Sequence, residues 1–181
     1  MNLRIEQIEY EDIRDIGSLT LDFTQRDSAE TCPVSLVQMP NGTGKTTTMG
    51  LLRTVILGED LDAKEVQSYE PEAGAKSGRF TVGFATGDSR FKNHLLFNYE
   101  AGQAEYENSR IQKEGGGRNE NHYMPSSLEK QLNEDMVNLF VFNGELTEEF
   151  IETDEGRAEQ ALKTVTRLDR IENKQKAIER L

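Results

Sequence analysis

The chain has 181 residues, enough for one globular domain with a buried core. Its 33 acidic residues outnumber its 21 basic residues, and the net charge of −12 excludes the uniformly basic surface of a small DNA-coating protein. A single cysteine, Cys32, excludes an internal disulfide and a cysteine-based zinc site. No apolar run is long enough to span a membrane, and the first ten residues do not resemble a signal peptide, so we expect a cytoplasmic protein with no membrane partner.

The first 23 residues predict a hairpin of two strands. Apolar and polar residues alternate over residues 3–10 and again over residues 19–23, as in half-buried strands. The alternation of the first strand breaks near Gln7, which indicates a shift in register. Gly17 and Ser18 are expected in the turn between the two strands.

A strand, a glycine-rich loop and a helix are predicted next. Residues 34–39 form a short apolar run that is typical of a central strand. It leads directly into the loop at residues 40–48, after which apolar residues recur at helical spacing as far as Leu57. Gly58 then provides a natural end for the helix.

The loop has the residues that a triphosphate needs. Gly42 and Gly44 allow the backbone to bend so that its N–H groups point at phosphates, and the following helix adds its own N-terminal N–H groups. Lys45 supplies a positive charge to the β- and γ-phosphates, and the Thr46 hydroxyl is the expected Mg²⁺ ligand. Thr47 can hydrogen-bond an α-phosphate. A glycine-rich turn that binds nothing is the alternative interpretation of the same residues.

The sequence departs in two places from the pattern of a self-sufficient phosphate-loop hydrolase. Met39 stands where the phosphate-loop pattern has its first glycine. A self-sufficient hydrolase also needs an apolar strand that ends in aspartate, but the best candidate, residues 139–142, ends in Asn143. The chain therefore contains the residues of half a hydrolytic site.

Later segments predict a meander, a loop and helices. The two-residue period returns in three strands of an antiparallel meander, near residues 80–84, 95–99 and 104–111. Residues 59–78 show little pattern, residues 112–122 are expected to be a mobile loop, and Ser126 or Ser127 could cap a helix.

The final segment, residues 157–181, is helical in composition. Its apolar residues recur at spacings of three and seven among seven basic and four acidic residues. This pattern predicts the start of a coiled coil, and its positive charge is a weak sign of an anionic partner. The alternatives are a solvated helix face or packing on the same domain.

Three segments resemble the N-terminal lobe of ABC-type ATPase heads. The Pro-Asn-Gly-Thr-Gly-Lys-Thr-Thr run at residues 40–47 resembles the Walker A loop of the SMC, RecF and SbcC group. Residues 3–23 are similar to the opening hairpin of that group, in which a basic residue near the position of Arg14 reaches the nucleotide phosphate. Residues 140–146 are similar to the Q-loop segment, with Asn143 in place of glutamine, and also resemble DndD-like ATPases of DNA phosphorothioation and phage defence.

The resemblance implies an α/β fold with a mixed sheet and an antiparallel meander. Residues 1–156 would form the N-terminal ATPase lobe, with its phosphate loop at residues 39–47, and residues 157–181 would begin the coiled coil. A C-terminal lobe of the same ATPase would complete the enzyme, so the isolated chain is expected to have negligible activity. The implied nucleotide-binding residues are Asn41, Gly42, Thr43, Gly44, Lys45, Thr46, Thr47 and Arg14, with Thr46 and Asn143 as Mg²⁺ ligands.

The implied function is ATP-gated action on DNA. Two heads would dimerise around ATP and Mg²⁺, and hydrolysis would release them during DNA processing, repair or defence. DNA and an accessory nuclease or modification enzyme would be partners of the assembled protein. Two other classes stay open: a complete small P-loop enzyme such as a kinase or GTPase, and a non-catalytic dimerisation module.

Overall fold

The computed structural model describes residues 3–24, 34–87, 89–111, 117–129, 132–134, 136–137 and 141. The chain divides into two units, Met1–Tyr123 and Met124–Leu181. Within the described residues, no helix combines the length and the apolar character needed to cross a membrane.

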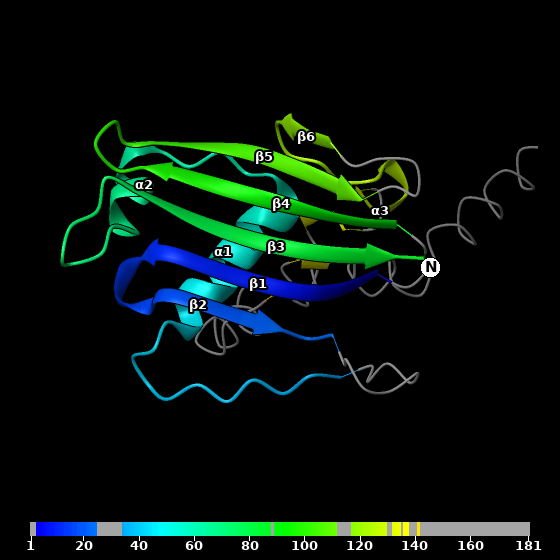
Figure 1. Cartoon of the computed structure of the whole chain (residues 1–181), viewed down its shortest axis with the longest axis horizontal. Helices are drawn as coiled ribbons and strands as arrows, with labels where there is room; N and C mark the ends of the chain where they lie inside the picture. Colours follow the sequence, from blue (N-terminus) through cyan, green and yellow to red (C-terminus); the bar gives the residue numbers. More distant parts are fainter. Residues whose placement is uncertain are drawn as a thin grey trace, which may run out of the picture. The chain divides into compact units, whose positions relative to one another are not determined.

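Unit 1 is built on a six-stranded antiparallel sheet in the order β2-β1-β3-β4-β5-β6 (Figure 1). Consecutive strands pair as hairpins except at the centre, where β1 pairs with β3. The strands are β1 (Leu3–Ile13), β2 (Gly17–Asp22), β3 (Ser77–Thr86), β4 (Ser89–Asn98), β5 (Gln103–Ile111) and β6 (Gly117–Glu120), and a 3₁₀ turn, η1 (Arg14–Ile16), joins the first two.

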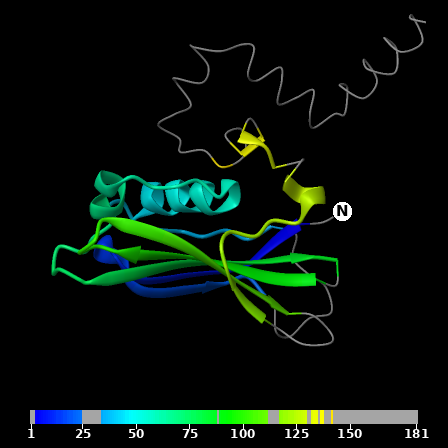
Figure 2. The same ribbon diagram turned by 90° about the horizontal axis from the view of Figure 1, so that it is seen from above.

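Two helices cover one face of this sheet, α1 (Lys45–Leu57) and α2 (Ala63–Ser68) (Figure 2). The strands place every second residue on that face, and in the centre of the sheet most of these residues are apolar and buried, with Asn93 a buried polar exception. The core includes Tyr10, Phe80, Val82, Phe84, Leu95 and Phe97 from the strands and Leu51 and Val55 from α1. The alternation that predicted the meander is therefore confirmed.

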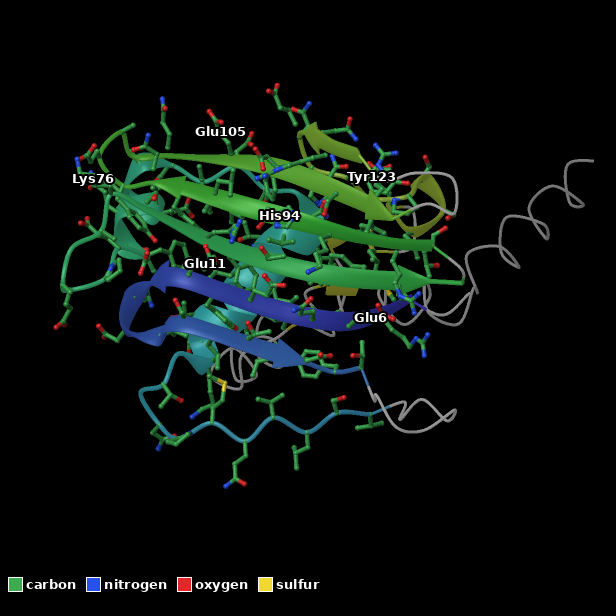
Figure 3. All side chains as sticks on the ribbon, in the orientation of Figure 1. Glu6, Glu11, Lys76, His94, Glu105 and Tyr123 are labelled. Carbon is green, nitrogen blue, oxygen red and sulfur yellow. The ribbon has the colours of Figure 1, made fainter. Side chains whose placement is uncertain are left out.

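The opposite face is polar and carries ion pairs between strands (Figure 3 labels Glu6, Glu11 and His94). Each pair joins a glutamate to a lysine or arginine on another strand, either the adjacent one or, for two pairs between β1 and β4, the strand beyond β3. The pairs are Glu6–Arg90 at 2.9 Å, Glu9–Lys92 at 2.9 Å, Glu11–Arg79 and Glu107–Arg118.

Helix α1 has the ends that the sequence predicts. It begins at Lys45, directly after the loop, and ends where Gly58 takes a left-handed conformation and donates its N–H to the Thr54 carbonyl at 2.8 Å. The Tyr106 hydroxyl from β5 also donates to the Thr54 carbonyl at 3.0 Å. The helix is thus fixed to the sheet at its C-terminal end.

The predicted strand at residues 34–39 is wrong. This segment is not a strand, and its apolar side chains lie in solvent, with Val34 79% and Leu36 94% exposed. A strand forms only when its backbone N–H and C=O groups find a partner strand, and no described residue pairs with this segment. The α/β class holds, but the sheet is antiparallel throughout the described residues, so the mixed sheet is not found there.

Smaller predictions also change. Helix α2 lies in the stretch that showed no pattern, and β6 occupies part of the expected loop at residues 112–122. The first hairpin turns at residues 14–16, before Gly17. The predicted register break is confirmed as an irregularity between Ile5 and Gln7.

The described part of unit 2 contains α3 (Ser126–Glu129), in agreement with a helix that starts at Ser126 or Ser127. Helical hydrogen bonds from Val137 to Asn133 and from Val141 to Val137 follow. Three predictions lie outside the described residues. They are the Q-loop-like segment with Asn143 (only Val141 of it is described), the boundary at residue 156 and the coiled coil.

Candidate phosphate-binding site

The loop before α1 is folded on itself. Gly42 and Gly44 have φ angles of +79° and +92°, which place both residues in the left-handed region that glycine enters at little cost. The Thr43 hydroxyl donates to the Pro40 carbonyl at 2.7 Å and closes the turn. The loop therefore has a defined shape that ends at the first residue of α1.

Lys45 lies over this loop. Its ammonium group donates to the Met39 carbonyl at 3.1 Å, to the Pro40 carbonyl at 2.9 Å and to Asn41 Oδ1 at 3.0 Å. An ammonium has three donors, so these contacts satisfy all of them. Lys45 is itself exposed, and an anion that reaches the loop would exchange neutral acceptors for charged ones, which hydrogen-bond more strongly.

The N-terminus of α1 has the electrostatics of an anion site. Its first turn contains no acidic residue, and its N-cap, Gly44, has no side chain that could accept from the backbone N–H groups of that turn. The first bond of the helix runs from the Thr48 N–H to the Gly44 carbonyl at 2.8 Å. Helix N-termini ordinarily attract carboxylates, because the helix dipole places partial positive charge there.

Arg14 brings a second cation to the same turn. Its Nη1 donates to the Thr47 hydroxyl and its Nε to the Ser68 carbonyl, both at 2.8 Å. The Arg14 backbone N–H donates to the Tyr69 carbonyl at 2.8 Å, and the guanidinium carbon lies 5.2 Å from the centre of the Tyr69 ring. The hairpin tip is thus fastened to the first turn of α1 and to the end of α2.

Two further contacts hold the hairpin against the loop and helix. A Cβ atom built on Gly44 would lie 2.6 Å from Ile16 Cδ1, so the backbone of the loop passes directly beside the hairpin tip. The Tyr10 hydroxyl donates to Thr48 Oγ1 at 2.9 Å. Burial raises the pKa of Tyr10, so this hydroxyl stays protonated as a donor.

No family model matches the chain, and a search of curated proteins finds no match either.

The structure brings together the predicted nucleotide-binding residues that it describes. Residues 41–47 form the loop and the first turn of α1, and Arg14 reaches them from the hairpin. Thr46 lies exposed in that turn, where its hydroxyl, phosphate oxygens and water would suit a Mg²⁺ ion that enters with a nucleotide. Thr47 is buried, and its hydroxyl accepts from Arg14.

Sequence reasoning missed Ser68 and Tyr69, because it missed α2. The available signal was the spacing of Asp62 and Glu65. Asp62 Oδ1 accepts from the Glu65 N–H at 2.8 Å, and Glu65 Oε2 accepts from the Asp62 N–H at 2.8 Å, which together form a capping box. That spacing marks a helix start even in a six-residue helix.

A hollow of about 540 Å³ lies between α1 and α2, and its charged lining residues are three acids and one arginine. Glu59, Asp60 and Glu65 line it, and Arg53, the cation among the lining residues, is paired with Glu59 at 2.8 Å. This hollow would repel phosphate. An anionic ligand is better placed at the loop, where Lys45 and Arg14 lie.

Proposed function

We propose that this chain is the ATP-binding half of an SMC-like ATPase head. In this proposal two heads dimerise around ATP, and the assembled enzyme couples binding and hydrolysis to DNA processing, repair or defence. The observation that carries it is the pair of cations, Lys45 and Arg14, at an uncapped helix N-terminus without an acidic residue.

This arrangement favours a polyanion. A cation near a helix N-terminus is destabilised by the dipole, by roughly 0.3–1 kcal/mol at an exposed site. In the absence of an anion, this effect disfavours both Lys45 and Arg14. A triphosphate in the loop would attract both cations as well as the helix N-terminus, and it could accept from backbone N–H groups there. Mg²⁺ bound with it would neutralise part of the phosphate charge.

The exposed segment at residues 34–39 supports the view that the chain is half of a head. It is extended, apolar and continuous with the phosphate loop, yet Leu36 is almost fully exposed. An apolar extended segment is well suited to accept a strand from another chain or lobe. A C-terminal lobe would supply that strand and the carboxylates that hydrolysis needs.

The rest of the assignment belongs to the same proposal. The partners are the C-terminal lobe, a second head, DNA and an accessory nuclease or modification enzyme, in the cytoplasm. The reaction is ATP hydrolysis by the completed head. The resemblance to the Q-loop makes Asn143 a proposed Mg²⁺ ligand.

Calorimetry with Mg-ATP tests the nucleotide site. We expect the wild-type chain to bind and Lys45→Ala to weaken binding by roughly 10- to 100-fold, because a charged contact to phosphate is lost. Lys76→Ala is the matched control, because Lys76 is 84% exposed, pairs with Glu100 and lies outside the loop. Unchanged binding by Lys45→Ala, or no binding by the wild type, would contradict the proposal and favour a non-catalytic module.

Phosphate release tests the half-head. We expect negligible release by the chain alone and release after a C-terminal lobe is added, and we expect Leu36→Asp to block that complementation while leaving ATP binding intact. Rapid turnover by the chain alone would instead identify a complete P-loop enzyme.

A further inference from the structure

The end of α2 makes three separate contacts with Arg14. The Ser68 carbonyl accepts from Arg14 Nε, the Tyr69 carbonyl accepts from the Arg14 backbone N–H, and the Tyr69 ring lies against the guanidinium. The Tyr99 hydroxyl shares its one proton between the Asp12 carbonyl at 2.8 Å and the Tyr69 carbonyl at 3.2 Å. The hairpin tip and α2 are therefore linked through both backbone and side chains.

These contacts hold Arg14 in an unfavourable backbone conformation. Its φ angle is +43°, in the left-handed region. This conformation is unfavourable in free energy for any residue other than glycine. Such a conformation persists only where the surroundings fix it. The same contacts direct the guanidinium to the Thr47 hydroxyl, in the first turn of α1.

We propose that α2 and Tyr69 form a positioning platform for Arg14, which presents its guanidinium to the phosphates bound at residues 42–47. Tyr69 acts through Arg14 and is a positioning residue. This inference rests on the proposed nucleotide site and adds to it an element that lies outside the phosphate loop.

The Tyr69 ring is the part to test. Tyr69→Leu removes the ring, while Tyr69→Phe keeps the ring and the backbone carbonyl and is the matched control. We expect Mg-ATP affinity to fall about five- to tenfold in Tyr69→Leu and to stay within about twofold in Tyr69→Phe. Equal affinities for Tyr69→Leu and the wild type would overturn the proposal.

A double-mutant cycle with Arg14→Ala identifies the route of the effect. We expect Tyr69→Leu to cause no further loss of affinity in the Arg14→Ala background, because the platform then has nothing to position. If the two losses instead multiply, Tyr69 acts on the nucleotide directly and the proposal is wrong.

A measurement without nucleotide separates this inference from the proposed function. In chain labelled with ¹⁵N-arginine, we expect the Arg14 Nε–H signal to be slow to exchange with water in the wild type and in Tyr69→Phe, and fast in Tyr69→Leu. An unchanged signal in Tyr69→Leu overturns the platform whatever the Lys45→Ala result.

If Tyr69→Leu does not fold, a less disruptive variant tests the same platform. Asp62→Ala removes the N-cap of α2 at an exposed position and loosens the helix. Glu72→Ala makes the same charge change at an exposed residue outside α2. We expect Asp62→Ala to speed exchange of the Arg14 Nε–H and Glu72→Ala not to; equal exchange in both variants would contradict the platform.

Discussion

Gly42 and Gly44 share a left-handed backbone but differ in their surroundings. A Cβ at Gly42 would meet no neighbour within 4 Å among the described residues, whereas a Cβ at Gly44 would lie 2.6 Å from Ile16 Cδ1. The first position therefore needs glycine for its conformation alone. The second also needs it because the hairpin tip touches the loop.

This difference predicts unequal effects of alanine. Gly42→Ala should lower the free energy of unfolding by about 1–2 kcal/mol, the cost of a left-handed non-glycine residue. Gly44→Ala should cost more, because the added methyl also displaces Ile16. The measurement is urea unfolding of both variants, with Ile16→Ala in the Gly44→Ala background as a rescue that removes Cδ1 and Cγ1, the two atoms that the new methyl would meet. Equal losses in both variants, or no rescue, would contradict the account.

At the scale of elements, the sheet was the most predictable part of the fold. Alternating residues such as Phe80, Val82 and Phe84 follow directly from a sheet with one buried face. The segment at residues 34–39 could not be predicted in the same way, because its apolar composition does not show whether a partner strand is present. The role of Tyr69 could not be predicted, because it depends on contacts with the hairpin, which is distant in the sequence. The proximity of Arg14 to the loop was expected from family resemblance and not from the spacing of residues.

The open face of the sheet, the polar face opposite the helices, also has a predictable response to pH. His94, on β4, bonds the Thr81 and Ser109 hydroxyls at 2.8 and 3.2 Å. Burial is the main cause that lowers the pKa of His94, and the charges of Arg79, Arg118 and Lys92 lower it further, while Glu9 opposes them.

The sign of the effect on stability follows from proton uptake. Below about pH 6.5 the unfolded chain protonates His94 while the folded chain resists, so the free energy of unfolding should fall as the pH drops towards the lowered pKa. The check is urea unfolding between pH 8 and 5 for the wild type and His94→Gln. The variant should lose less stability over this range, and identical pH profiles would refute the assignment.

At the scale of the whole molecule, charge governs which partners can bind. The net charge is −12, and Arg79, Arg90, Lys92 and Arg118 on the open face each pair with a glutamate. DNA binding depends on cations that can neutralise phosphates. Cations already engaged by carboxylates contribute little to it.

We therefore expect weak binding of duplex DNA by this chain. At about 150 mM salt the Kd should be about 100 µM or weaker, near the weak end of nonspecific binding. Fluorescence anisotropy with a labelled duplex measures this, and a second series at low salt shows whether any residual affinity is electrostatic. A micromolar Kd at the higher salt would show that the chain carries a DNA site of its own.

The pairing of β1 with β3 also imposes an order on folding. The hairpins β3–β4, β4–β5 and β5–β6 close over short distances in the sequence, whereas Leu3 pairs with Thr86 across the intervening chain. Long closures cost more entropy, so we expect the meander to form early and β1 to dock late. The phosphate loop and α1 lie inside the segment that this late step closes. A ligand that recognises the finished loop would then slow unfolding while leaving the rate of folding almost unchanged.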